Sequence, residues 1–226
     1  MKCSDCGKEI KPVVAIDIDG TLADYHGHLI KFAQGYLQSW PHYIPYDGAG
    51  SFREWFCGVF DVDRRVWDDV KLAYRQGGMK RTQPVLEESY RIFQTATDLG
   101  AEVWLTTTRP FLRLDNIDPD TRFWLRRNGM SDYYGLLYDE HKYRRLAESV
   151  DPRRVVAVVD DLSEQYDSAE ELFGAGVPIL RRGLYNRAIM RRNVGHDTRG
   201  VCVGIMDRVR RWRYGQGGPR QMAFAV

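Results

Sequence analysis

Two pairs of aspartates are the residues of this sequence best suited to chemistry. Asp17 and Asp19 follow one short apolar run, and Asp160 and Asp161 follow another. Carboxylates gathered in a buried place are costly unless a cation neutralises them, and Mg²⁺ prefers oxygen ligands. If both runs are strands of one parallel sheet, the four carboxylates meet at its carboxyl edge and predict a magnesium site.

Hydroxyl and basic groups lie between the two acidic pairs. A further apolar run ends in three threonines, 106–108, followed by Arg109. Hydroxyl and guanidinium groups are good hydrogen-bond donors to phosphate oxygens. Lys142 offers a further fixed cation, and two arginines that follow it, Arg144 and Arg145, compete for this role. These residues indicate an edge that can hold a phosphate group.

The elements that must position these residues can be predicted from the hydropathy pattern. Short apolar runs rich in β-branched residues predict buried parallel strands, and stretches with helical spacing separate them. The predicted strands are 13–16, 103–105, 136–138, 155–159 and 177–180, and the predicted helices are 85–99, 120–128 and 163–173. This alternation favours an α/β fold, a parallel sheet with helices on both faces.

Residues 25–74 interrupt the alternation after the first strand. They hold 12 of the 28 aromatic residues of the chain, with predicted helices at 27–40 and 63–76 joined by a loop that contains Pro and Gly. An insert at this position would lie over the carboxyl end of the first strand, where open α/β sheets bind ligands. The alternative is that these aromatic rings only fill a small helical core.

Composition and charge exclude several classes of protein. The length of 226 residues suits one α/β domain with an insert, and no run of 18 apolar residues predicts a membrane span. The polar N-terminus is not typical of a secretory signal, and four cysteines are too few for a disulfide scaffold, so a cytoplasmic setting is expected. Residues 181–226 carry 11 Arg against 2 Asp on an otherwise acidic chain, which suggests an anionic partner.

The order of these motifs resembles the haloacid dehalogenase (HAD) superfamily of phosphatases. The resemblance covers residues 13–180 and rests on Asp17-Ile18-Asp19-Gly20-Thr21-Leu22, a strand that ends in Thr107, then Lys142, then Asp160-Asp161. It implies a HAD-like sheet of the flavodoxin or Rossmann type, a Mg²⁺ site and an aspartyl-phosphate mechanism. It also implies three parts: a Cys-x-x-Cys segment at 1–11, a core at 12–24 and 83–226, and a small helical C1 cap inserted at 25–82.

The same resemblance implies roles for the four aspartates. Asp17 would attack phosphorus, and Asp19 would protonate the leaving oxygen and then activate water. The carboxylates of Asp17 and Asp160 and the backbone carbonyl of Asp19 would bind Mg²⁺. Asp161 would support these ligands or bind the metal through water. An Asp at position 19 favours phosphatase over dehalogenase chemistry, because an ester oxygen needs a proton to leave.

Thr107 and Lys142 would hold the oxygens of the transferring phosphoryl group. Thr106 and Thr108 are alternatives to Thr107. Because side chains alternate along a strand, these two lie on the opposite side from Thr107, and we favour Thr107.

A finer resemblance to the 5′(3′)-deoxyribonucleotidases concerns the substrate. It rests on the aromatic cap, on Ala23-Asp24 after the first motif, and on the segment 180–186 before a Trp-bearing helix. It implies a nucleoside monophosphate as substrate and makes a homodimer plausible. Aromatic rings of the cap can stack on a base, and four candidates for base binding are Phe52, Trp55, Phe56 and Trp67.

A second resemblance, to the 3′-phosphatase domain of polynucleotide kinase-phosphatases, gives the alternative function. It rests on Thr107-Thr108-Arg109-Pro110 and on the segment 120–129, and it makes Thr108 and Arg109 candidate substrate-binding residues. The Arg-rich tail would attract the end of a nucleic acid. The large cap favours a small substrate that it can enclose.

Two further possibilities concern metal and activity. Cys3 and Cys6 form half of a zinc-ribbon pattern, and Zn²⁺ there would need Cys57, Cys202 or a histidine to complete its ligands. A nucleotide-binding module without catalysis is disfavoured, because every catalytic motif position is filled.

Overall fold

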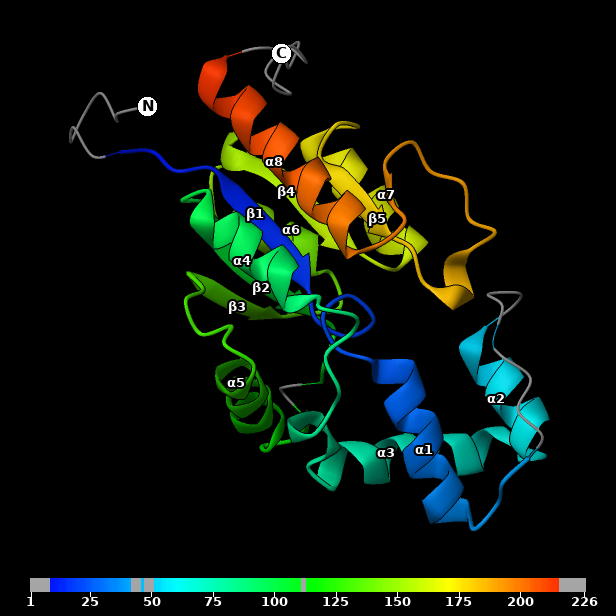
Figure 1. The fold of residues 1–226 in the computed structure, drawn as a ribbon. Coiled ribbons are helices and arrows are strands. Elements are labelled where there is room, and N and C mark those ends of the chain that lie inside the picture. Colours follow the sequence, from blue (N-terminus) through cyan, green and yellow to red (C-terminus); the bar gives the residue numbers. More distant parts are fainter. Residues whose placement is uncertain (1–8, 42–45, 47–50, 111–112, 216–226) are drawn as a thin grey trace.

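The fold is built on one parallel sheet of six strands. The computed structural model describes residues 9–41, 46, 51–110 and 113–215. The strand order is β3-β2-β1-β4-β5-β6, and every neighbouring pair is parallel (Figure 1). The strands are β1 Val13–Asp17, β2 Glu102–Thr107, β3 Gly135–Tyr138, β4 Val155–Asp160, β5 Pro178–Arg181 and β6 Val194–Gly195. The five predicted strands are confirmed, and the two-residue β6 is too short to carry a hydropathy signal.

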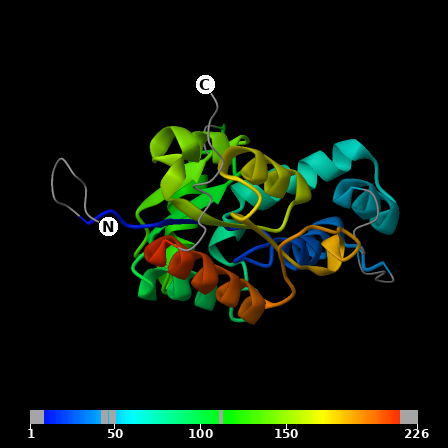
Figure 2. The ribbon, with the colours of Figure 1, turned by 90° about the horizontal axis from the view of Figure 1, so that it is seen from above.

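Helices cover both faces of the sheet, as the alternating pattern predicts (Figure 2). On one face, α4 and α8 pack against β1, β2 and β4 in a core that also includes rings and methyl groups of α5. On the other face, α6 and α7 pack against the same central strands. The five helices are α4 Tyr90–Asp98, α5 Ile117–Arg127, α6 Lys142–Ser149, α7 Ser163–Phe173 and α8 Thr198–Tyr214. An α/β sandwich of this kind is the fold class expected from the sequence.

Two helix starts differ from the predictions for local reasons. The helix predicted from 85 begins at Tyr90, because Val85 forms an antiparallel bridge with Ala23 and Glu88 has a left-handed backbone with φ of 57°. The helix predicted from 120 begins earlier, at Ile117, because Pro119 is accommodated in its first turn.

Residues 25–82, which we call the insert, leave the sheet after β1 and return before β2. The insert contains α1 Tyr25–Leu37, α2 Phe52–Phe60, α3 Arg64–Gln76 and the short 3₁₀ helix η1 Met79–Arg81. Its helices pack around their own hydrophobic cluster, beyond the carboxyl ends of the strands (Figure 1). The sequence predicts α1 and α3 but not α2, which begins at a capping box formed by Ser51 and Glu54.

The cysteine and membrane predictions meet the structure in different ways. Cys3 and Cys6 lie outside the described residues, and Cys57 and Cys202 are free thiols on α2 and α8. None of the helices in the described ranges combines the length and apolar character that a bilayer crossing requires.

Candidate active site

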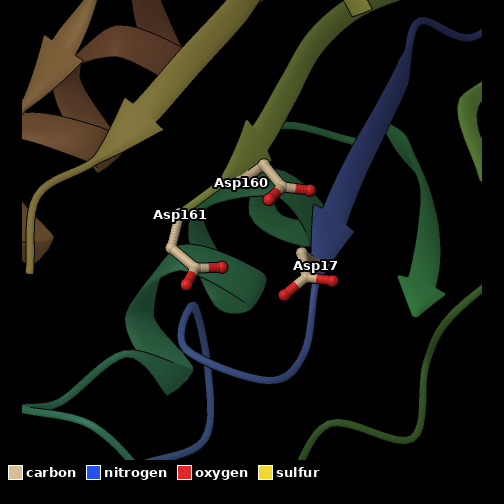
Figure 3. A group of neighbouring side chains, drawn as sticks. All are labelled: Asp17, Asp160 and Asp161. Atoms are coloured by element: carbon tan, nitrogen blue, oxygen red, sulfur yellow. The ribbon is translucent and has the colours of Figure 1, made fainter. Parts of the chain in front are cut away.

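Three buried carboxylates meet at the carboxyl edge of the sheet. Asp17 is the last residue of β1, Asp160 is the last residue of β4, and Asp161 follows it. Because β1 and β4 are paired in parallel, their ends lie side by side. One oxygen atom from each carboxylate lies within 4.8 Å of the others, and the three residues are 4%, 0% and 1% exposed. Figure 3 shows the three side chains converging from the two strand ends.

One lysine neutralises part of this cluster. Lys142, the first residue of α6, places its Nζ 2.7 Å from Asp160 Oδ2 and also donates to Asp17 Oδ1. The Tyr143 hydroxyl donates to Asp160 Oδ2, and the backbone N–H of Leu162 donates to Asp160 Oδ1 at 2.9 Å. The two residues that competed with Lys142 for the cationic role, Arg144 and Arg145, are exposed.

Electrostatics leave the cluster short of positive charge. Burial raises the pKa of Asp17 well above its usual range; Lys142 opposes this rise and Asp160 adds to it. Burial, followed by the charge of Asp160, raises the pKa of Asp161 to about 7. Three carboxylate oxygens that face one another with a single ammonium group form the donor set that a hard divalent cation prefers. The residues present therefore fit a Mg²⁺ ion.

Asp161 is held by the turn after β1 and by the segment after β5. Thr21 Oγ1 donates to Asp161 Oδ1 at 3.3 Å, and the Tyr185 hydroxyl donates to Asp161 Oδ2. Asn186 fixes the backbone of Asp161 by donating to its carbonyl at 2.8 Å. Gly20 is required here, since a Cβ at this position would lie 2.2 Å from Asp161 Oδ2. Its φ of 90° is also a backbone conformation that residues with a side chain rarely adopt.

Asp19 does not belong to the cluster of three carboxylates, and its side chain is bound by two cations instead. Arg109 donates to both of its oxygens, from Nη2 to Oδ1 at 2.7 Å and from Nε to Oδ2 at 2.8 Å. Lys80 Nζ lies 2.8 Å from Oδ2. Burial would raise the pKa of Asp19, but Arg109 and Lys80 outweigh it and hold the pKa well below its usual range. In this arrangement the carboxylate is ionised.

Arg109, predicted to bind substrate, uses its guanidinium on protein groups. Besides Asp19, it donates to Gln83 Oε1 and to Thr121 Oγ1, each at 2.7 Å, and it is buried. It acts in this structure as a support for Asp19. The neighbouring candidate Thr108 is exposed.

The register of β2 bears on the choice among the threonines. Thr106 pairs with Asp17 across the parallel ladder, so the side chains of these two residues share a face of the sheet. Thr107 is one residue further along, and its Oγ1 accepts a hydrogen bond from the backbone N–H of Arg109 at 3.2 Å. Thr107 stays the predicted phosphoryl-binding residue. Thr106 is the alternative, and the register favours it because its side chain shares a face of the sheet with Asp17.

The four aromatic candidates divide into two pairs. Phe56 and Trp67 are 0% and 5% exposed and pack edge to face in the core of the insert, with ring centroids 4.7 Å apart. Phe52 and Trp55 are half-buried and stacked, with centroids 5.3 Å apart and an interplanar angle of 24°.

The half-buried pair is connected to the carboxylate cluster through two further rings. His26 lies 4.4 Å from Phe52 and 4.3 Å from Tyr185, measured between ring centroids. Tyr185 in turn donates its hydroxyl to Asp161. These rings lead from the insert to the carboxylate cluster.

Several residues of the site were not predicted from the sequence. Lys80, Tyr143 and Tyr185 contact the acidic groups, and Gln83 accepts a hydrogen bond from Arg109. The position of Tyr143 next to Lys142 was a usable signal, because neighbours at the start of a helix can both reach one strand edge. Lys80 and Tyr185 lie in the short 3₁₀ helices Met79–Arg81 and Leu184–Asn186, and Gln83 follows the first of these; such short segments carry no hydropathy pattern that points to the site.

Solved structures with this fold include HAD-like enzymes. A hydrolase of the haloacid dehalogenase-like family from Streptococcus pneumoniae superposes with a TM-score of 0.59 at 11% sequence identity, over 85% of this chain and 97% of that chain. A predicted phosphatase from Clostridium acetobutylicum gives 0.60 at 11% identity, over 88% and 100% of the two chains. CbbY from Rhodobacter sphaeroides, in complex with phosphate, gives 0.52 at 15% identity, over 84% and 95%.

No protein-family model and no curated protein matches the chain. At the identities above, the likeness to solved structures establishes the fold, a HAD-like α/β sheet with a helical insert after its first strand. The acidic cluster occupies the carboxyl edge of that sheet, where open α/β folds bind their ligands.

Proposed function

We propose that the protein is a Mg²⁺-dependent phosphomonoester hydrolase. The observation that carries this proposal is the buried group of Asp17, Asp160 and Asp161, with Lys142 bound to two of them, at the carboxyl edge of a HAD-like sheet. The predicted phosphatase among the solved structures of similar fold and the phosphate bound to CbbY support the same class of reaction.

The proposed reaction has two steps. In the first, a carboxylate oxygen of Asp17 forms a bond to phosphorus, the bond to the ester oxygen breaks, and Asp19 gives its proton to that oxygen. In the second, water attacks phosphorus, its proton passes to Asp19, and the bond to Asp17 breaks to release phosphate. Lys142 and Thr107 hold phosphoryl oxygens through both steps.

The metal is assigned to the carboxylates of Asp17 and Asp160, together with the backbone carbonyl of Asp19 and with Asp161. When bound, Mg²⁺ neutralises negative charge on the phosphoryl oxygens. Asp19 must carry a proton for the first step, so its Oδ1 must exchange the contact with Arg109 Nη2 for the leaving oxygen of the substrate.

The first prediction concerns Asp17. We expect Asp17→Asn to lower Mg²⁺-dependent phosphate release at least about 1,000-fold, because an amide oxygen is a poor nucleophile and the covalent step is lost. Phosphate release is measured with Mg²⁺, with excess EDTA, and after Mg²⁺ is restored. Circular dichroism and thermal unfolding confirm that the variant is folded. Full activity in EDTA contradicts the metal mechanism, and unchanged turnover in Asp17→Asn contradicts the nucleophile.

The substrate we propose is a nucleoside monophosphate. Supporting this, the half-buried stack of Phe52 and Trp55 reaches the carboxylate cluster through His26 and Tyr185. A phosphate at the cluster and a base against these rings would be joined by a sugar between them. Stacking of one base on an aromatic ring contributes about 1–3 kcal/mol.

The alternative substrate, a 3′-phosphate at a nucleic-acid end, draws on the Arg-rich tail. Several of these arginines are engaged within the protein: Arg182 donates to three backbone carbonyls, Arg208 donates to Gly176 O at 2.7 Å, and Arg191 pairs with Asp167. These contacts favour a structural role for that part of the tail. A panel of mononucleotides, sugar phosphates and 3′-phosphorylated oligonucleotides decides between the substrates, and much faster reaction of the oligonucleotides selects the alternative.

A further inference from the structure

Lys80 is a buried cation that the insert brings to the core. It belongs to η1, the last element of the insert, and only 2% of it is exposed. Its Nζ lies 2.8 Å from Asp19 Oδ2 and above the rings of Tyr25 and Tyr74, at 4.3 and 5.4 Å from their centroids. Burying an ammonium group is costly unless it is paired, and Asp19 is the carboxylate that pairs with this one.

The second cation on Asp19 comes from the core and is rigidly held. Arg109 follows β2 and binds both oxygens of Asp19. Gln83 and Thr121 each accept a further hydrogen bond from its guanidinium group at 2.7 Å. Asp19 Oδ2 therefore accepts from Arg109 Nε and Lys80 Nζ together, one donor from each part of the molecule.

Neither cation forms an open anion site. Both side chains are buried, and both are directed at the same carboxylate. Two donors bound to Asp19 Oδ2 fix the rotation of the carboxyl group and, with it, the position of Oδ1. Proton transfer depends on this geometry, because the acid must lie within hydrogen-bond reach of the reacting oxygen.

We infer that Lys80 is a positioning residue for Asp19, through which the packing of the insert sets the orientation of the proton-transferring carboxyl group. This inference rests on the proposed function, in which Asp19 protonates the leaving oxygen. Lys80 itself does not contact the reacting atoms in this scheme. It makes the catalytic geometry depend on the insert as well as on the core.

The choice of leaving group separates this role from a merely structural one. An alkyl phosphate, such as a nucleoside 5′-monophosphate, expels a strongly basic alkoxide and requires a proton from Asp19. 4-Nitrophenyl phosphate expels a stable phenolate and does not. Loss of positioning therefore harms the first ester selectively, whereas a general loosening of the site harms both. The parameter to compare is kcat/KM, because it covers phosphoryl transfer to Asp17 and excludes the later hydrolysis common to both substrates.

The experiment uses Lys80→Met, Lys80→Arg and a matched control, Lys71→Met. Lys71 is also a lysine of the insert with its ammonium over an aromatic ring, Trp67 at 5.1 Å. We expect Lys80→Met to lower kcat/KM for the alkyl ester about 100-fold and for the nitrophenyl ester less than about 5-fold, since general acid catalysis contributes about 10²–10⁴. Lys80→Arg should restore part of the loss, and Lys71→Met should behave as wild type.

Equal losses for the two esters in Lys80→Met overturn the inference. Wild-type enzyme that hydrolyses neither ester, nor any ester of the substrate panel, overturns the proposed function instead.

A double-mutant cycle in urea unfolding tests the contact without activity. Lys80→Met should destabilise the protein less in an Asp19→Asn background than alone, and strictly additive effects contradict the pairing.

Discussion

Asp17, Asp160 and Asp161 carry three carboxylates into the interior, and among the described residues Lys142 is the ammonium group that pairs with them. Around Asp19 the imbalance is reversed, because one carboxylate faces two cations. The residues of the site thus form two adjoining charge clusters, one short of positive charge and one with an excess of it. The first cluster suits a divalent cation, and in the second both cations are directed at Asp19.

At this scale we predict that the carboxylate cluster binds Mg²⁺ whether or not substrate is present. Mg²⁺ at 100 times its dissociation constant should stabilise the wild-type protein by about 2.7 kcal/mol. For a chain of this length, this raises the midpoint of thermal unfolding by about 5–10 °C. Asp160→Asn should reduce the shift to less than about 2 °C, because it removes one charged ligand.

Asp167→Asn is the matched control for that measurement. Asp167 lies on α7, close in sequence to Asp160, and pairs with the side chain of Arg191 at 2.7 Å. It should keep the full Mg²⁺ shift. An equal shift in Asp160→Asn and in wild type would remove Asp160 from the ligand set.

At the scale of elements, the site depends on turns that follow strand ends. β1 and β4 bring the carboxylates to one edge, and the tight turn after β1 then passes directly beneath Asp161. Gly20 permits this turn: its backbone is left-handed, and Gly20 N donates to the Ala23 carbonyl at 2.9 Å. The segment after β5 closes the other side, with Tyr185 and Asn186 bound to Asp161.

We therefore predict opposite effects of Gly→Ala substitutions at two positions. Gly20→Ala should lower the free energy of unfolding by about 2–4 kcal/mol, through backbone strain and the clash with Asp161. Gly35→Ala, at an exposed position of α1 with no atom within 4 Å of its added Cβ, should raise it by about 0.5–1 kcal/mol. Urea unfolding of both variants provides the measurement, and a neutral Gly20→Ala would contradict the geometry of the turn.

At the scale of the whole molecule, the insert and the core share one polar network. Tyr74 of α3 accepts a hydrogen bond from Gln83 Nε2 at 3.0 Å, and its hydroxyl lies 3.0 Å from His28 Nδ1 of α1. Gln83 in turn accepts from Arg109. The insert is thereby connected to Asp19 by this network as well as by Lys80. Its half-buried rings are linked to Asp161 through His26 and Tyr185.

We predict that the insert confers selectivity for a base. Trp55→Ala should raise KM for a nucleoside monophosphate about 5- to 150-fold, the equivalent of about 1–3 kcal/mol of stacking. It should leave kcat/KM for a small sugar phosphate nearly unchanged. Trp40→Ala serves as the control, since Trp40 is 68% exposed. Equal losses on both substrates would assign Trp55 to packing of the insert rather than to base binding.

The amino-acid sequence alone is enough to predict three features in their order along the chain: the apolar runs, the acidic residues that end them, and an aromatic-rich insertion after the first run. These features are local, because a buried parallel strand must be apolar and its polar end must leave the sheet. Asp17, Asp160, Asp161 and Lys142 could be named from that pattern together with the family resemblance, and the fold brings them into contact.

The surroundings of those groups depend on the folded structure and could not be predicted from the sequence. Lys80 and Tyr185 reach Asp19 and Asp161 from 61 and 24 residues away along the chain, and both lie in 3₁₀ helices of three residues, too short to carry a periodic signal. Sequence also could not separate Phe56 and Trp67, buried in the insert, from the half-buried Phe52 and Trp55, because all four are aromatic residues at helical spacing. Which ring is buried, and which cation is close to which carboxylate, depends on how the insert packs against the core, and that packing is a property of the folded chain.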